Sequence, residues 1–294
     1  MAKIVELCGS PGVGKSSIFY ELEKRRKNNY KWTTASNINP YGKKSFYDFV
    51  KSIFLKVKNG QNQGDLSAKN LDSFYDFVRF IYREIKKGRN FVDLEAMKEA
   101  GERFVAQNPK YIKACWGNIF ARQTKSYNGL DLRFEKAKFI YRIIKKNQVL
   151  KERKANQVII IDEGFINMID RGLYKSITPE AEKQEIYDLL EVMPLPEALV
   201  YIETDLNENA KRLFSREEIR DMHKGLSLSE LIDFTKTCRE RILTAIKYLE
   251  NKGIPVLYID STNPIRENAD KIIEFTENVE LTSVNISSEK TIAF

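Results

Sequence analysis

A glycine-rich stretch near the start of the chain has residue types that suit phosphate binding. Residues 9–16 read GSPGVGKS, a full match to G-x-x-x-x-G-K-[ST], between a predicted strand and a predicted helix. Glycines let the backbone curl so that successive N–H groups point inward at phosphate oxygens. Lys15 can reach the β- and γ-phosphates, and the Ser16 hydroxyl can ligate Mg²⁺. We therefore predict a nucleoside triphosphate site formed by Gly9, Ser10, Pro11, Gly12, Val13, Gly14, Lys15, Ser16 and Ser17.

Two acidic residues follow an apolar run in the middle of the chain. The run VIII at 158–161 leads directly into Asp162 and Glu163. A carboxylate at the end of a strand beside the phosphate loop lies where Mg²⁺ needs an acidic partner, so Asp162 is predicted to hold the ion. Glu163 has three open roles: activating water in a hydrolase, accepting a proton from an acceptor hydroxyl, or supporting the ion from outside its ligand shell. The alternative is a strand that simply ends in two solvated acids.

Two arginines four residues apart follow the apolar run ALVYIE at 198–203. If residues 207–216 are helical, Arg212 and Arg216 point from one face. Phosphoryl transfer spreads negative charge over the moving group, and arginine is suited to neutralise it. We predict that both arginines act there, and a solvated basic helix face is the alternative.

The elements around these residues alternate between strands and helices. Near-continuously apolar runs predict strands at 3–8, 157–162, 198–203 and 255–260, and a stretch rich in aromatic and threonine residues predicts a further strand at 30–35. Helical patterns fall between them at 16–27, 207–216, 229–252 and 265–278. This alternation is typical of an α/β fold with a doubly wound parallel sheet.

Residues 36–154 interrupt the alternation. Apolar and aromatic residues recur there at three-to-four spacing, which predicts about five helices. Residues 36–156 carry 26 Lys and Arg against 12 Asp and Glu, a net charge of +14, whereas the whole chain has +8. We predict a core at 1–35 and 155–280, a basic helical insertion at 36–154 on the acceptor side, and a polar tail at 281–294. The charge suggests an anionic partner, with a solvated helical surface as the alternative.

The composition and the distribution of residue types argue against a disordered, membrane-spanning, secreted or zinc-binding protein. Hydrophobic residues make up 42% and charged residues 31% of 294, which is typical of a soluble globular chain. No apolar run is long enough to span a membrane, and the N-terminus has no secretion signal. Cys8, Cys115 and Cys238 lack pairing or metal spacing, and the single histidine, His223, makes a zinc site untenable. A reduced cytoplasmic protein is expected.

The motifs together resemble the P-loop kinases of nucleosides and nucleotides, thymidylate kinase among them. The resemblance rests on GSPGVGKS, IIIDEG at 159–164, YIETDLNENAKRLFSR at 201–216 and KGIPVLYIDST at 252–262. It covers residues 1–35 and 155–278. It implies a P-loop NTPase sheet with strand order 2-3-1-4-5, ATP and Mg²⁺ as cofactors, and adenine near residues 260–263. It also implies a mobile lid whose R-x-x-x-R pattern is matched by Arg212 and Arg216.

The chain departs from that group where the acceptor binds. An Asp-Arg pair or a Glu-Arg-Ser string usually follows the third strand, and here Asp162-Glu163-Gly164 stands instead. Residues 36–154 replace the expected short substrate-binding helices. The acceptor therefore stays open, although Arg171 is a candidate contact to a substrate anion on position alone.

The predicted function is ATP–Mg²⁺-dependent phosphoryl transfer to a small anionic or nucleotide-like acceptor. An ATPase switch that uses Glu163 to activate water is one alternative. A nucleic-acid-processing ATPase or polynucleotide kinase that uses the basic insertion is another. The sequence does not decide ATP against GTP, or the oligomeric state. The residues predicted to carry the chemistry are Lys15, Asp162, Glu163, Arg212 and Arg216, with Ser16 and Asp162 at the metal.

Overall fold

The fold is seen in a computed structural model of the chain. It describes residues 2–26, 31–37, 94–121, 133–152, 157–171, 179–216 and 225–289. The chain divides into two compact units, one of Met1–Asn37 with Ala100–Phe294 and the other of Ile38–Glu99. Nearly all of the second unit lies outside the described residues, so the account below concerns the first.

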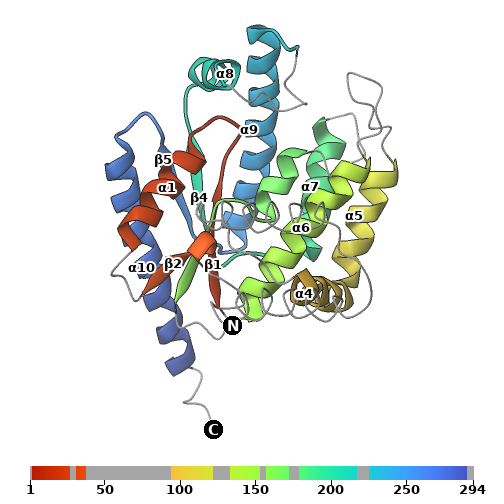
Figure 1. The fold of residues 1–294 in the computed structure, drawn as a ribbon, viewed down its shortest axis with the longest axis vertical. Helices are drawn as coiled ribbons and strands as arrows, with labels where there is room; N and C mark the ends of the chain where they lie inside the picture. The colour runs from red at the N-terminus through yellow and green to blue at the C-terminus, as the bar shows by residue number, and fades with distance from the viewer. Residues whose placement is uncertain are drawn as a thin grey trace, which may run out of the picture. The chain divides into compact units, whose positions relative to one another are not determined.

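The centre of the first unit is a parallel sheet with the strand order β2-β3-β1-β4-β5 (Figure 1). β1, β3 and β4 are almost fully buried, as their apolar sequences predict for strands covered on both faces. The order and the parallel pairing confirm the predicted α/β fold. The strands are β1 (Lys3–Cys8), β2 (Trp32–Thr34), β3 (Val158–Ile161), β4 (Ala198–Glu203) and β5 (Val256–Asp260).

Helices cover both faces of the sheet (Figure 1). On one face, α1 and α10 contact each other and pack with Val5 and Leu7 of β1. On the other face, α5, α6, α7, α9 and the 3-10 helix η3 pack around Cys8 and Tyr201, because successive strand residues point to opposite faces. The helices are α1 (Lys15–Arg25), η2 (Ala35–Asn37), α4 (Leu94–Gln107), α5 (Pro109–Ala121), α6 (Arg133–Glu152), η3 (Ile166–Arg171), α7 (Pro179–Val192), α8 (Leu206–Phe214), α9 (Leu228–Asn251) and α10 (Ile265–Glu289).

Three helices of the predicted insertion at 36–154, α4, α5 and α6, are described. They share the core of the sheet's second face, where the ring of Phe165 lies 5.6 Å from Phe104 and 5.4 Å from Tyr111 between centroids. From Ala100 onward, the described part of this region therefore belongs to the same compact unit as the sheet. Most of the remainder lies outside the described residues, so the insertion's boundaries stay a prediction.

Two helices end at places that the sequence did not predict. α8 stops at Phe214, where the N–H of Ser215 donates to the carbonyl of Lys211, so Arg216 lies beyond the helix. α10 continues to Glu289, through the predicted end at 278 and into the predicted tail. Among the described helices, none has the length and apolar character needed to cross a bilayer.

Candidate active site

The loop between β1 and α1 curls tightly, and two of its glycines are required for the curl. Gly9 and Gly12 have φ of 149° and 94°, values that residues with a Cβ rarely adopt. A Cβ on Gly9 would overlap the carbonyl oxygen of Ile202, and one on Gly12 would overlap Asn209. Because α1 begins directly after the loop, at Lys15, the N–H groups of its first turn and its positive dipole end face the loop. The backbone here has the geometry of an anion-binding site.

The Lys15 side chain bends back over the loop. Its Nζ donates to the carbonyl oxygens of Gly9 and Ser10, the latter at 2.9 Å. The Ser10 hydroxyl accepts a hydrogen bond from Nδ2 of Asn209, a buried residue of α8, at 2.9 Å. These contacts hold the ammonium group on the inner side of the loop and tie α8 to the same loop.

Apart from Gly9, the predicted loop residues divide into two groups. Ser10 and Val13 are buried, Ser10 against Asn209 and Val13 in the core beside α1, so their side chains support the loop from behind. Sequence spacing does not distinguish these two from their neighbours. The loop residues that line the cavity are Pro11, Gly12, Gly14, Lys15, Ser16 and Ser17.

Asp162 and Glu163 lie at the carboxyl end of β3, beside the loop, because β3 pairs in parallel with β1. Each approaches a basic residue of α6. Lys146 Nζ is 3.5 Å from Asp162 Oδ1, and Arg142 Nη2 is 3.1 Å from Glu163 Oε2. The sequence analysis missed this basic pair, although two cations four residues apart on a helical pattern were visible. Nothing local in the sequence joins residues 142–146 to the end of β3.

The two predicted arginines lie on the α8 side of the cavity. The carboxylate of Asp205 caps α8 by accepting from the N–H groups of Asn207 at 2.8 Å and Glu208 at 3.1 Å. Arg212 donates to Glu208 Oε1 at 2.9 Å and to Ser261 Oγ, beyond β5, at 3.2 Å. Arg216 follows the end of the helix and also lines the cavity. Both arginines therefore face the loop, but from a helix and from the segment after it.

A buried carboxyl group lies behind the turn that follows β3. Glu6 of β1 is 1% exposed, and its Oε1 accepts from the N–H of Asn167 at 3.0 Å and from its Nδ2 at 3.1 Å. Burial raises the pKa of Glu6 to about 7, although hydrogen bonds from Asn167, Ile166 and Gly164 act in the opposite direction. The sequence analysis missed both Glu6 and Asn167. An acidic residue inside the apolar strand KIVELC was the available signal.

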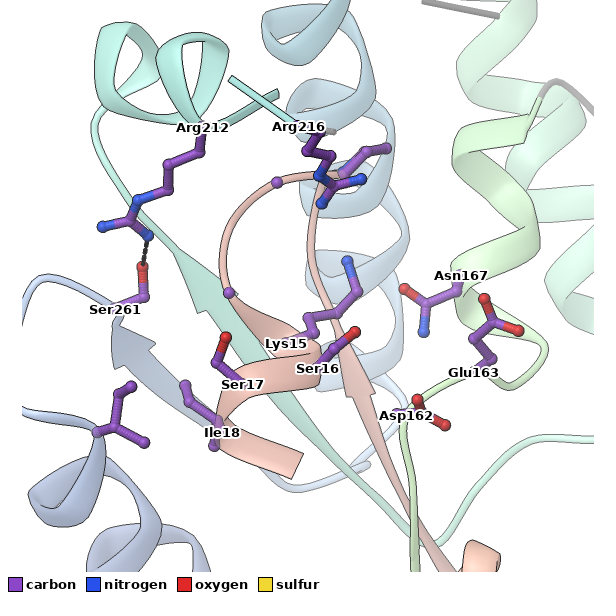
Figure 2. Close-up of a pocket in the computed structure, with 14 residues that line it drawn as sticks. Lys15, Ser16, Ser17, Ile18, Asp162, Glu163, Asn167, Arg212, Arg216 and Ser261 are labelled. Atoms are coloured by element: carbon purple, nitrogen blue, oxygen red, sulfur yellow. Dashed lines mark hydrogen bonds between the residues drawn. The ribbon is translucent and has the colours of Figure 1, made fainter. Parts of the chain in front are cut away.

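The phosphate loop, the two carboxylates after β3, Asn167 and the two arginines surround one cavity of about 390 Å³, within the size range of small-molecule sites. Figure 2 shows Lys15 and Ser16 in the middle, with Arg212 on one side and Asp162 and Glu163 on the other. Segments far apart in the sequence thus meet at the carboxyl edge of the sheet, where open α/β sheets bind ligands.

The oxygen donors at this cavity suit a magnesium ion. Ser16 offers a hydroxyl and Asp162 a carboxylate, and Mg²⁺ prefers oxygen ligands. Among the described residues, no group of three or more His, Cys, Asp and Glu could cage an ion. Mg²⁺ is usually held by one or two carboxylates together with substrate phosphates, so the donor set fits an ion shared with a nucleotide.

The side chains of two residues named from the sequence, Arg171 and His223, lie outside the described part of the structure. Arg171 ends η3, and its side chain lies outside the described part. His223 lies outside the described residues altogether. The prediction that Arg171 contacts a substrate anion therefore stays a prediction.

Comparison with known proteins finds similarity to solved structures alone. No protein-family model matches the sequence, and no curated protein matches it. The solved structure of deoxyadenosine kinase from M. mycoides with bound dATP is similar, with 13% identity over 92% of this chain and 97% of that chain, at a TM-score of 0.37. At this TM-score the similarity defines neither feature: the order of the strands defines the fold, and the site is defined by its own geometry.

Proposed function

We propose that this protein is an ATP–Mg²⁺-dependent phosphotransferase acting on a small anionic or nucleotide-like acceptor. The observation that carries the proposal is the convergence of three distant segments on one cavity. Phosphoryl transfer needs a phosphate cradle, an acidic partner for the metal and cations over the moving group. The three segments offer these parts in the form of Lys15 with Ser16, Asp162 with Glu163, and Arg212 with Arg216.

The loop and α1 would bind the nucleotide. Backbone N–H groups and the positive end of α1 suit the phosphates, and Lys15 suits the β- and γ-oxygens. Ser16 and Asp162 would hold Mg²⁺, which when bound neutralises part of the phosphate charge. Arg212 and Arg216 would contact the moving phosphoryl group from the α8 side and keep water away from it.

Glu163 is the proposed proton acceptor for an attacking hydroxyl. It lines the cavity at the end of β3, on the side opposite α8 (Figure 2). A carboxylate there can take a proton as the acceptor oxygen attacks in line with the leaving phosphate. Its ion pair with Arg142 fixes the carboxylate beside the cavity without enclosing it, since the side chain is 30% exposed.

The charge on α6 supports an anionic acceptor. Arg142 and Lys146 lie next to the two cavity carboxylates, at 3.1 and 3.5 Å. A phosphate or carboxylate on the acceptor would meet these cations beside Asp162 and Glu163. The three cysteines are buried thiols, and a reducing, cytoplasmic environment is part of the proposal.

ATP hydrolysis is the second candidate, and the placement of Glu163 favours it. The same carboxylate that can accept a proton from an acceptor can accept one from water. The arginine pair argues for transfer, because cations that close over the moving group also exclude water. A nucleic-acid acceptor rests on the basic region 36–156, most of which lies outside the described residues.

The test is a labelling experiment on the full chain. The protein is incubated with γ-labelled ATP, Mg²⁺ and separate pools of nucleosides, nucleoside monophosphates, sugars and 5′-hydroxyl oligonucleotides. We expect label in one of the small-molecule pools, with Lys15→Ala as the inactive control. Label in the oligonucleotide pool would select the nucleic-acid kinase. Release of labelled phosphate in every pool, with no labelled product, would select the hydrolase.

A further inference from the structure

Asn167 is held in a single orientation in the wall of the cavity. It lies in the first turn of η3 and is 4% exposed. Its backbone N–H donates to Glu6 Oε1 at 3.0 Å, and its Nδ2 donates to the same oxygen at 3.1 Å. Nδ2 also donates to the carbonyl oxygen of Leu7 at 2.7 Å. Both side-chain protons are therefore committed to β1.

These bonds decide which side-chain atom of Asn167 faces the cavity. A backbone carbonyl can only accept, so the atom beside Leu7 must be the nitrogen and the amide cannot be flipped. The carbonyl oxygen Oδ1 then points the other way, and no described residue donates to it. Figure 2 shows this oxygen on the side of Asn167 that faces Lys15, and Asn167 lines the cavity. The cavity wall thus presents a fixed, uncharged hydrogen-bond acceptor.

The Glu6 carboxylate is what holds the turn in this form. An acidic group in an apolar interior is strongly disfavoured unless it is hydrogen-bonded. Here the donors come from one short turn, the backbone of Gly164 and Ile166 together with Asn167. The turn lies so close to the carboxylate that a Cβ on Gly164 would overlap it. A hydrocarbon side chain in place of Glu6 would fill the core but leave those backbone donors and one of the two Nδ2 protons of Asn167 without a partner, with only the bond to the Leu7 carbonyl remaining.

We propose that Asn167 Oδ1 accepts a hydrogen bond from a hydroxyl or amino group of the phosphoryl acceptor, and that Glu6 is the positioning residue that holds Asn167 for this contact. The subsite rests on the proposed phosphotransferase function and narrows its substrate class. The acceptor then carries a neutral donor next to its attacking oxygen, because Asn167 and Glu163 line the same side of the cavity (Figure 2). A sugar hydroxyl or a base amino group of a nucleotide-like molecule has this chemistry.

The test uses pairs of acceptors that differ by one donor group. Nucleosides and nucleoside monophosphates are assayed beside analogues that lack one sugar hydroxyl or one exocyclic amino group. For one pair, we expect the full chain to prefer the member with the donor by about tenfold in kcat/KM, the scale of one hydrogen bond. Asn167→Ala should abolish that preference by raising the acceptor KM, with the KM for ATP changed by no more than about twofold.

A matched variant separates this contact from a general loss of structure. Asn147 is also buried and also donates through Nδ2 to a backbone carbonyl, that of Ile143 at 3.1 Å, but it does not line the cavity. Asn147→Ala should keep the preference. Glu6→Gln retains one oxygen that accepts from Asn167 and should keep part of the preference, whereas Glu6→Leu should lose it. If the Glu6 variants do not fold, the comparison of Asn167→Ala with Asn147→Ala still tests whether Asn167 contacts the acceptor.

The outcomes separate this subsite from the function on which it rests. If the wild-type chain phosphorylates no acceptor, the phosphotransferase and the subsite are both overturned. If it phosphorylates an acceptor and Asn167→Ala lowers kcat/KM equally for both acceptors of every pair, the phosphotransferase function stands and the subsite is overturned. Preference lost in Asn167→Ala and kept in Asn147→Ala supports the subsite.

Discussion

Lys15 suits the proposed phosphate contact because the loop places its ammonium group on the inner side of the curl. The contacts of Nζ with the carbonyls of Gly9 and Ser10 require the glycine conformations that precede it. A lysine in that position provides a point charge that no neighbouring side chain of the loop replaces.

The first prediction is that Lys15→Ala abolishes ATP binding while the fold survives. The side chain is only partly buried, so its removal leaves no cavity in the core. Titration calorimetry with ATP–Mg²⁺ measures the binding, and circular dichroism measures the fold. Lys24→Ala, an exposed lysine of the same helix, is the control and should bind like the wild type. Affinity of Lys15→Ala within about twofold of wild type would mean that the loop does not bind the nucleotide.

Glu6 shows at the same scale how a structural carboxylate links stability to pH. Its pKa is raised from 4.5 to about 7 in the folded chain, because burial disfavours the charged form. Folding therefore favours the protonated group, and its contribution to stability is complete below pH 4.5. That contribution is lost as the pH rises to about 7, and it amounts to roughly 3 kcal/mol.

The second prediction is that the free energy of unfolding falls between pH 5 and pH 8 in a way that depends on Glu6. Glu6→Gln has no titrating group there, so the difference in unfolding free energy between wild type and variant should change over this range. Urea unfolding at several pH values measures it. Glu240→Gln, at an exposed position of α9, is the control, and its unfolding free energy should change with pH in the same way as that of the wild type. A constant difference between wild type and Glu6→Gln would contradict the raised pKa.

Among the elements, α8 connects the most parts of the site. Asp205 caps its first turn, Asn209 bonds the phosphate loop, and Arg212 reaches Ser261 beyond β5. The sequence predicted the helix and both arginines from spacing and position. It did not predict the helix end at Phe214, because Ser215 and Arg216 fit the helical pattern as well as the residues before them.

The third prediction concerns the arginines that α8 brings to the cavity. Arg212→Ala or Arg216→Ala should slow acceptor phosphorylation by roughly 2–4 kcal/mol of transition-state stabilisation, as for a lost electrostatic donor. ATP binding should change far less, because the loop makes most of the phosphate contacts. Steady-state transfer rates and ATP calorimetry measure the two effects. Lys211→Ala removes an exposed cation of the same helix and should leave both unchanged. Equal effects in all three variants would show a general charge effect only.

Other elements show what sequence alone can and cannot give. The sheet and its order could be predicted because the buried strands are apolar throughout and the motifs stand at their ends. Arg142 and Asn167 could not be assigned to the site. Their contacts join α6 to the end of β3, and η3 to the middle of β1, across 21 and 161 residues of chain. Such contacts depend on how distant elements pack together, and this packing produces no recognisable residue spacing in the sequence.

At the scale of the whole molecule, the proposed site combines the glycine-rich loop with a carboxylate that suits either transfer or hydrolysis. The outcome depends on what else reaches the cavity, because Glu163 can take a proton from an acceptor or from water. The arginines near α8 lie on one side of the carboxyl edge of the sheet, and the basic pair on α6 lies on the other side, where it is ion-paired with Asp162 and Glu163. That distribution suits two anionic reactants held face to face, which is the arrangement that transfer requires.

The fourth prediction separates the two reactions by comparing ATP consumption with and without the acceptor identified by labelling. Glu163→Gln keeps the shape of the side chain but removes the base, so it should slow transfer to a hydroxyl acceptor while ATP still binds. In a transferase, wild-type ATP consumption should rise steeply when the acceptor is added, and it should depend on Arg212 and Arg216 as well as on Glu163. Asp188→Asn, an acidic residue of α7 that does not line the cavity, serves as the control. One result would contradict transfer: rapid hydrolysis without acceptor that is lost in Glu163→Gln but unaffected by either arginine variant. Only a hydrolase needs the carboxylate without the cations that shield the moving group from water.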